Sequence, residues 1–129
     1  MNGNYLLDTS VIIAFLRRDS DVLNQMQKRQ SILIPMIAVG ELFYGVLKSG
    51  YGGKREAHLR QFLASSVVLG GDRETGYWYA FIKNQLRQKG RPIPENDIWI
   101  GALGMQYQLI IATRDKHFTE IDGLNVEMW

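Results

Sequence analysis

Short apolar segments that alternate with longer helical segments are the feature that most constrains the fold of this 129-residue chain. Residues 5–7, 32–34, 67–69 and 109–112 form brief apolar runs, and residues 124–128 form a weaker one. Such runs are typical of parallel strands that are covered by helices on both faces. The alternation therefore predicts an α/β fold, with a central, mainly parallel β-sheet flanked by α-helices.

The segments between these runs repeat apolar side chains at the spacing of one helix face. The predicted helices cover residues 11–16, 19–30, 37–48, 56–63, 73–89 and 97–107. We expect Asp72 to cap the helix that runs to about Lys89, and Pro94 or Asn96 to open the last one. Neither an internal repeat nor an interdomain linker interrupts the pattern, which predicts a single domain over residues 1–129.

Composition excludes several classes of protein. The chain has no cysteine, which rules out disulfide scaffolds, thiolate zinc sites and cysteine nucleophiles. Its longest apolar run, residues 32–39, contains Pro35 and is far shorter than the roughly 20 residues that span a bilayer. No basic stretch precedes the first apolar segment, as a signal peptide would require. We therefore expect a cytoplasmic protein without a membrane partner.

Four acidic residues stand in positions that suit a shared site. Asp8 directly follows the first predicted strand and Asp115 follows the fourth, so both should lie at the carboxyl edge of the sheet. Asp97 lies at a helix start, and Glu41 interrupts an otherwise apolar helix. Simpler roles exist for three of them: a helix cap for Asp8, a turn for Asp115 and a favourable helix-end charge for Asp97. Glu41 is harder to explain in this way, because a charge in an apolar segment is costly unless it is paired or bound to a metal.

Four converging carboxylates would repel one another unless a cation lies between them. Oxygen ligands without cysteine and with few histidines suit Mg²⁺ or Mn²⁺ rather than zinc. Without these four acids the chain has 9 acidic and 15 basic residues, which is a net charge of +6. An acidic metal site in a basic surrounding suits the cleavage of a polyanion.

Two further patterns are open to more than one interpretation. Gly45 and Gly101 each follow an acid by one helical turn, which predicts a crowded polar pocket around Glu41 and Asp97. The basic stretches at residues 48–60 and 83–91 can grip phosphates, although a solvated helix face is the simpler interpretation.

At these residues the sequence resembles the PIN-domain family, in particular the ribonuclease toxins of VapBC toxin–antitoxin pairs and, among them, the transfer-RNA-specific endonucleases. The matching motifs occur in family order over nearly the whole chain. They are residues 6–10, 40–45, 90–94, 96–102, 113–115, 117–118 and 123–124.

The resemblance implies a PIN fold, Mg²⁺- or Mn²⁺-dependent RNA hydrolysis, a homodimer and a VapB-type antitoxin partner. Asp8, Glu41, Asp97 and Asp115 match the four acids of the family. Asp8 and Asp97 would hold the main metal, Asp115 would complete the site, and Glu41 would bind metal or position the attacking water.

The polar residues Ser10 and Thr113 match supporting positions beside the first and last acids. In two places the sequence departs from the family pattern. Ala38 stands where many members carry a threonine, which predicts a missing hydrogen bond near Glu41. Gly101 and Gly104 replace common alanines and should soften their helix.

Outside the acids, Arg91, Arg114 and Lys116 are candidates for contacts with RNA phosphates. His117 can touch substrate, but a surface or packing role is the simpler interpretation. Tyr77 and Phe81 form either a dimer face or the edge of a broad core.

Three other functions compete with an endoribonuclease toxin. A signalling receiver domain has similar length, but it needs paired acids after the first strand, where Asp8 stands without an acidic neighbour. A non-catalytic RNA-binding module would not need all four acids. Structure-specific cleavage of DNA uses the same metal chemistry and stays open as an alternative.

Overall fold

The computed structural model describes residues 4–29, 31–50 and 53–129. Its elements follow in the order β1 (Tyr5–Leu7), α1 (Thr9–Leu16), α2 (Ser20–Gln27), β2 (Ile32–Pro35), α3 (Met36–Lys48), α4 (Gly53–Ala64), β3 (Val67–Leu69), α5 (Arg73–Lys89), α6 (Glu95–Tyr107), β4 (Ile110–Thr113), the 3-10 helix η1 (Lys116–Glu120) and β5 (Asn125–Met128). Within the described residues the strands form a five-stranded sheet in the order β3-β2-β1-β4-β5. Every pairing in it is parallel, which confirms the predicted α/β fold.

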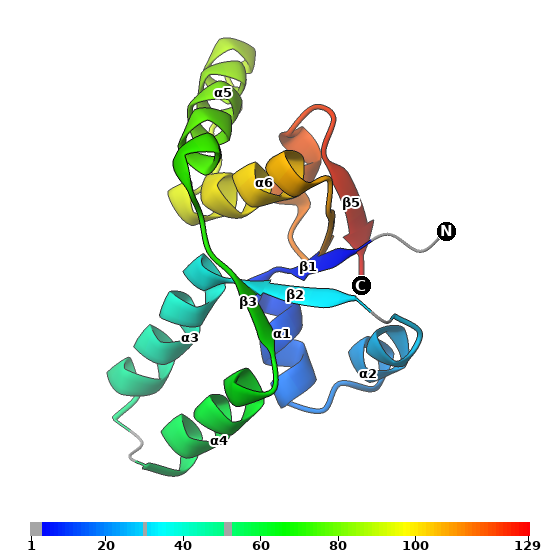
Figure 1. Cartoon of the computed structure of the whole chain (residues 1–129), viewed down its shortest axis with the longest axis vertical. Coiled ribbons are helices and arrows are strands. Elements are labelled where there is room, and N and C mark those ends of the chain that lie inside the picture. Colours follow the sequence, from blue (N-terminus) through cyan, green and yellow to red (C-terminus); the bar gives the residue numbers. More distant parts are fainter. Residues whose placement is uncertain (1–3, 30, 51–52) are drawn as a thin grey trace.

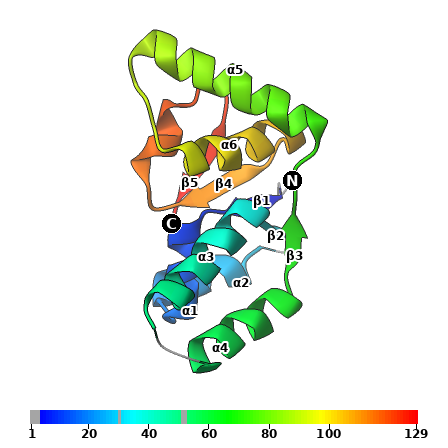
Figure 2. The same ribbon diagram turned by 90° about the vertical axis from the view of Figure 1, so that its left-hand side faces the viewer.

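The sheet separates two layers of helices (Figure 1). In β1, Tyr5 and Leu7 pack with α1–α4 on one face, while Leu6 packs with α5 and α6 on the other. Successive side chains of a strand point to opposite faces, so a run of three apolar residues supplies both cores. Figure 2 shows α5 lying over α6 on one side of the sheet, with α3 and α4 on the other.

Helix α5 shows most directly how local sequence sets an element. The Asp72 side chain accepts the N–H groups of Glu74 and Thr75 at 2.9 and 3.2 Å, and the Thr75 hydroxyl accepts the Asp72 N–H at 2.9 Å. This capping box satisfies backbone groups that the first helical turn leaves open. Gly90 ends the helix with φ +68°, a left-handed conformation that glycine adopts at little cost. Both ends of α5 therefore lie where the sequence predicts them.

The glycines of α6 have a different role from the predicted one. A Cβ atom at Gly101 would lie 2.7 Å from Ile121, and one at Gly104 would lie 2.8 Å from both Ile111 and Leu124. These glycines let α6 pack closely on β4 and the C-terminal segment, so their neighbours are apolar. Among the described residues, no atom lies within 4 Å of a Cβ built at Gly45. Neither glycine therefore lies in a crowded polar setting, although Glu41 and Asp97 themselves line a common polar cleft, as expected.

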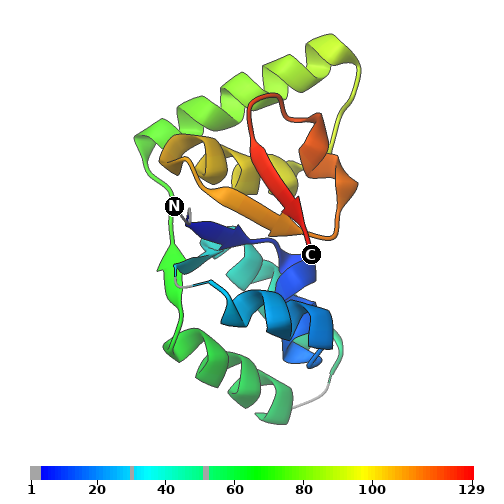
Figure 3. The ribbon, with the colours of Figure 1, turned by 90° about the vertical axis from the view of Figure 1, so that its right-hand side faces the viewer.

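The C-terminal segment lies against the end of β4. In Figure 3, β5 lies beside β4 at one edge of the sheet, with the C-terminus close to the end of β1. The backbone N–H of Trp129 bonds to the Thr113 carbonyl at 3.0 Å. Strand β4 extends to Thr113, one residue beyond the predicted strand, because β5 pairs with that last residue. No helix in the described parts of the chain has the length and apolar character needed to cross a bilayer.

Candidate metal centre

Asp8 occupies the point where β1 leads into α1. Its backbone N–H bonds to the carbonyl of Ala112 at 2.9 Å, which holds the residue against β4. Asp8 is the N-cap residue of α1, yet its side chain makes no capping hydrogen bond. The residue is only 5% exposed. Helix capping therefore does not account for this buried carboxylate.

Two hydroxyl groups hold one oxygen of the Asp8 carboxylate. Ser10 Oγ and Thr113 Oγ1 each donate to Asp8 Oδ2 at 2.8 Å. The Ser10 hydroxyl also accepts the N–H of Arg114 at 3.2 Å, and the Thr113 hydroxyl accepts the N–H of Asp115 at 2.9 Å. These bonds join the start of α1 to the loop after β4. Ser10 thus lies beside the first acid, as expected, whereas Thr113, expected beside the last acid, bonds to both the first and the last.

Asp97 lies in the first turn of α6, and its side chain is 13% exposed. Burial, followed by the charges of Asp8 and Asp115, raises the pKa of the Asp97 carboxyl to about 6. His117 opposes this shift, since a nearby positive charge favours the ionised carboxylate. The ionised form of Asp97 is thus disfavoured first by burial and then by the two neighbouring carboxylates, and a bound cation would stabilise it.

Asp115 is the N-cap residue of the short helix η1, and the ring of His117 lies between its carboxylate and that of Asp97. Asp115 Oδ1 accepts the N–H of His117 at 2.9 Å. The ring atom Nδ1 of His117 lies 2.9 Å from Asp115 Oδ1 and 3.4 Å from Asp97 Oδ2. Asp97, Asp115 and His117 can each offer a ligand atom, and these atoms lie within 4.8 Å of one another.

Sequence reasoning missed this position of His117. The sequence allows this histidine to touch substrate but favours a surface or packing role. Its side chain is 49% exposed, yet its ring lies against Asp97 and Asp115. The 3-10 turn after Asp115 brings it there, and that turn was not predicted. The signals in the sequence were the two-residue spacing between Asp115 and His117 and the match of residues 117–118 to a family motif.

Glu41 reaches the same cleft from α3. The cleft has a volume of about 410 Å³. Its lining comes from α3, from Pro94 and the first turn of α6, and from the loop that follows β4. Its lining residues are Glu41, Pro94, Glu95, Asn96, Asp97 and Asp115. Thr9 Oγ1 donates to Glu41 Oε1 at 2.7 Å. Ala38 is fully buried and has no hydroxyl group to offer Glu41. The bond to Glu41 comes from Thr9, a residue that the sequence analysis did not single out.

The three basic candidates differ in their surroundings. Arg114 donates from Nε to the carbonyl of Trp129 at 3.0 Å and pairs with Asp19 at 3.0 Å. Arg91 is 66% exposed and lies 3.7 Å from Glu120. Lys116 is an exposed residue of η1.

Most cations of the predicted phosphate-gripping stretch at residues 83–91 have partners within the chain. Lys83 pairs with Glu95, and Lys89 pairs with Asp122. The stretch therefore forms a solvated helix face with ion pairs on it, which agrees with the simpler interpretation and not with a free phosphate-binding surface.

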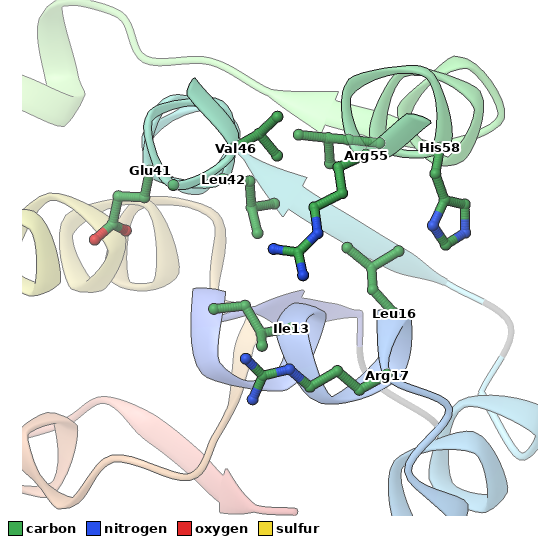
Figure 4. A pocket seen from close by; sticks show the side chains of 10 residues that line it. Ile13, Leu16, Arg17, Glu41, Leu42, Val46, Arg55 and His58 are labelled. Carbon is green, nitrogen blue, oxygen red and sulfur yellow. The ribbon is translucent and has the colours of Figure 1, made fainter. Parts of the chain in front are cut away.

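A second hollow of about 380 Å³ lies between α1, α3 and α4, and Glu41 belongs to its lining too. Its walls carry the apolar side chains of Ile13, Leu16, Leu42, Val46 and Leu59. Arg17 and Arg55 extend toward this space from opposite sides (Figure 4). We call it the basic groove. It combines an apolar floor with positive charge and ends beside the acidic cleft.

A family model, the PIN domain, matches residues 5–124. The chain belongs to the PIN domain family. Ribonuclease VapC2 of Haemophilus influenzae is 30% identical over 128 residues, and the match covers 97% of each chain. The tRNA(fMet)-specific endonuclease VapC of Shigella flexneri is 27% identical over 128 residues, again with 97% of each chain covered.

Solved structures agree with the sequence relatives. A crystal structure of VapBC2 from Rickettsia felis, bound to a DNA fragment from its promoter, contains a chain that matches this PIN domain with a TM-score of 0.90. The two are 25% identical, and the match covers 97% of this chain and 98% of the other. The resemblance seen in the sequence motifs is confirmed, and so is the PIN fold that it implied.

Proposed function

We propose that this PIN domain is the toxin of a type II toxin–antitoxin pair and acts as a divalent-metal-dependent endoribonuclease. The observation that carries the proposal is the meeting of Asp97 and Asp115 at the carboxyl edge of the sheet, with Asp8 close enough to raise the pKa of Asp97. Relatives that match over 97% of their length are ribonucleases by name, which supports RNA as the substrate.

The donor set fits Mg²⁺ or Mn²⁺. Carboxylate oxygens are the ligands that hard divalent ions prefer. The raised pKa of Asp97 is a second sign of fit, because it results from burial and from like charges that a cation would neutralise. We assign Asp8, Asp97 and Asp115 to holding the ion, and Glu41 either to the ion or to the attacking water.

A bound Mg²⁺ or Mn²⁺ would lower the pKa of water and stabilise charge on the scissile phosphate. The chain's own residues prepare that chemistry. Ser10 and Thr113 fix the Asp8 carboxylate through its Oδ2. Thr9, at the start of α1, orients Glu41 of α3 by its hydrogen bond. Such bonds hold ligands in orientation and hence limit the reorganisation needed when substrate binds.

RNA phosphates would approach over the basic side chains near the cleft. Lys116 is exposed beside Asp115 and is the strongest candidate of the three. A phosphate at Arg91 or Arg114 would compete with Glu120 or with Asp19, respectively. Because such contacts act through charge, we expect binding to weaken as salt rises.

Two protein partners belong to the proposal. The antitoxin would cover the basic groove, whose apolar floor suits an amphipathic segment and whose Arg17 and Arg55 suit its acidic side chains.

A second copy of this chain would pack on α5, where Tyr77 and Phe81 are 56% and 45% exposed and lie in contact. Large exposed aromatic side chains are typical of protein interfaces.

The deciding experiment is cleavage of labelled RNA by the purified protein. We expect activity with Mg²⁺ or Mn²⁺, none with EDTA, and a loss of at least about 100-fold for Asp8→Asn, as for other groups that act on the transition state. Asp21→Asn changes an exposed acid in α2 and should retain activity. Cleavage that persists in EDTA would refute the metal mechanism. Cleavage of DNA in preference to RNA would favour the alternative nuclease, and binding of RNA without cleavage would favour a non-catalytic module.

A further inference from the structure

The ring of His117 lies against the carboxylates of Asp97 and Asp115. Its Nδ1 atom is 2.9 Å from one oxygen of Asp115, 3.1 Å from the other and 3.4 Å from Asp97 Oδ2. Around an octahedral ion with bonds of about 2.1 Å, neighbouring ligand atoms lie about 3 Å apart. Nδ1 therefore already lies at about this spacing from an oxygen of each carboxylate, and the three ligand atoms lie within 4.8 Å of one another.

The backbone holds the histidine in this place. The N–H of His117 is bonded to Asp115 Oδ1 at 2.9 Å, within the 3-10 turn. The next residue, Phe118, is completely buried and anchors η1 in the core under α6. The His117 side chain remains half-exposed toward solvent. The ring is thus fixed near the acids before any ion arrives, and its ordering would cost little on binding.

We infer that His117 donates a nitrogen ligand through Nδ1 to the divalent ion held by Asp97 and Asp115, and that this ligand biases the site toward Mn²⁺ over Mg²⁺. The inference rests on the proposed metal-dependent function. Mg²⁺ strongly prefers oxygen ligands, whereas an imidazole nitrogen favours transition-metal ions. A site of carboxylates alone would discriminate less between the two ions.

Pulsed electron paramagnetic resonance on Mn²⁺ bound to the wild-type protein tests the bond directly. A directly bound imidazole produces a coupling between the ion and ¹⁴N, and we expect this coupling in the wild type. It should be absent in His117→Ala and in His117→Gln, two variants of different size that guard against a simple folding defect. The matched control is His58→Ala, which removes the other histidine of the chain and should retain the coupling.

Calorimetric titrations with Mn²⁺ and with Mg²⁺ test the preference. We expect the ratio of Mg²⁺ to Mn²⁺ dissociation constants to fall roughly tenfold in His117→Ala, mostly through weaker Mn²⁺ binding. Asp97→Asn should weaken both ions.

The outcomes separate this inference from the proposed function. Mn²⁺ bound to the wild type without nitrogen coupling, or an unchanged ratio in His117→Ala, would overturn the role of His117 and leave a carboxylate metal site intact. Failure of the wild type to bind either ion would overturn the metal-dependent function together with the inference.

Discussion

Thr113 donates a 2.8 Å hydrogen bond to Asp8 Oδ2, joining two residues that stand 105 positions apart in the chain. The same hydroxyl oxygen accepts the backbone N–H of Asp115 at 2.9 Å. Thr113 is completely buried at the end of β4. One side chain thus positions two of the acids that we assign to the metal, although it carries no charge itself.

Replacing Thr113 with valine keeps the shape of the side chain and removes its hydroxyl group. We expect the free energy of unfolding to fall by about 1–3 kcal/mol, because the Asp8 carboxylate and the Asp115 N–H each lose a buried partner. RNA cleavage should fall as well, since both acids lose a constraint. Urea denaturation and cleavage rates at saturating Mg²⁺ measure the two effects.

The control for this variant is Thr119→Val, at an exposed threonine whose hydroxyl bonds to the Lys116 carbonyl. It should change stability by no more than about 0.5 kcal/mol. Wild-type stability and activity in Thr113→Val would show that the hydroxyl does not position the acids.

Replacing Asp97 with asparagine should stabilise the metal-free fold while impairing the metal site. In EDTA at pH 7 the wild type must keep Asp97 ionised beside Asp8 and Asp115, so we expect the variant to be more stable, by roughly 1 kcal/mol. In saturating Mg²⁺ the difference should narrow or reverse, because the ion stabilises the wild type more strongly. Thermal melts with EDTA and with Mg²⁺ provide the comparison.

The difference in stability between the wild type and Asp97→Asn should depend on pH through the pKa of Asp97. Burial and like charges raise this pKa from 3.8 to about 6, so the folded wild type binds a proton that the unfolded chain releases above pH 4. Without metal, the wild type should gain stability relative to Asp97→Asn as pH falls from 7 to 5, and lose it again as pH rises through 6. A variant that is less stable than wild type in EDTA at pH 7 would show instead that Asp97 has a structural task at the start of α6.

Two glycine substitutions should change the free energy of unfolding in opposite directions. Gly104→Ala would place a methyl group 2.8 Å from Ile111 and Leu124 in the core, and we expect a net loss of about 1 kcal/mol despite the gain in helix propensity. Gly40→Ala, in the exposed middle of α3, meets no atom within 4 Å and should gain about 0.5–1 kcal/mol. Denaturant midpoints compare them, and two changes of the same sign would contradict the close approach of α6 to β4.

In bacterial cells, expression of the wild-type chain alone should arrest growth if it is an uninhibited ribonuclease. Asp97→Asn, expressed at a matched level, should relieve the arrest because its metal site is impaired. Growth curves with quantified protein levels test this expectation. Equal, unimpaired growth of both strains would count against the toxin assignment.

Periodicity and turn residues predicted most of the fold correctly. The capping box at Asp72 and the left-handed Gly90 are local features, so the bounds of α5 could be read from its own residues. The 3-10 turn after Asp115 could not, since a short turn has no apolar repeat that identifies it. Gly45 and Gly101 had the same spacing from an acid, yet one faces open space and the other lies against Ile121.

By itself, the sequence determined the α/β class and the alternation of strands with helices, and it singled out four candidate acids, because these depend on local propensity and on where apolar runs end. Only the tertiary structure decided which groups meet. It brought ligand atoms of Asp97, Asp115 and His117 within 4.8 Å of one another and the Thr9 hydroxyl within hydrogen-bond distance of Glu41. It also raised the pKa of Asp97 through burial and the nearby charge of Asp8. Coulombic and hydrogen-bonding energies depend on distances of a few ångströms, and these are set by how strands and helices pack rather than by their order in the chain.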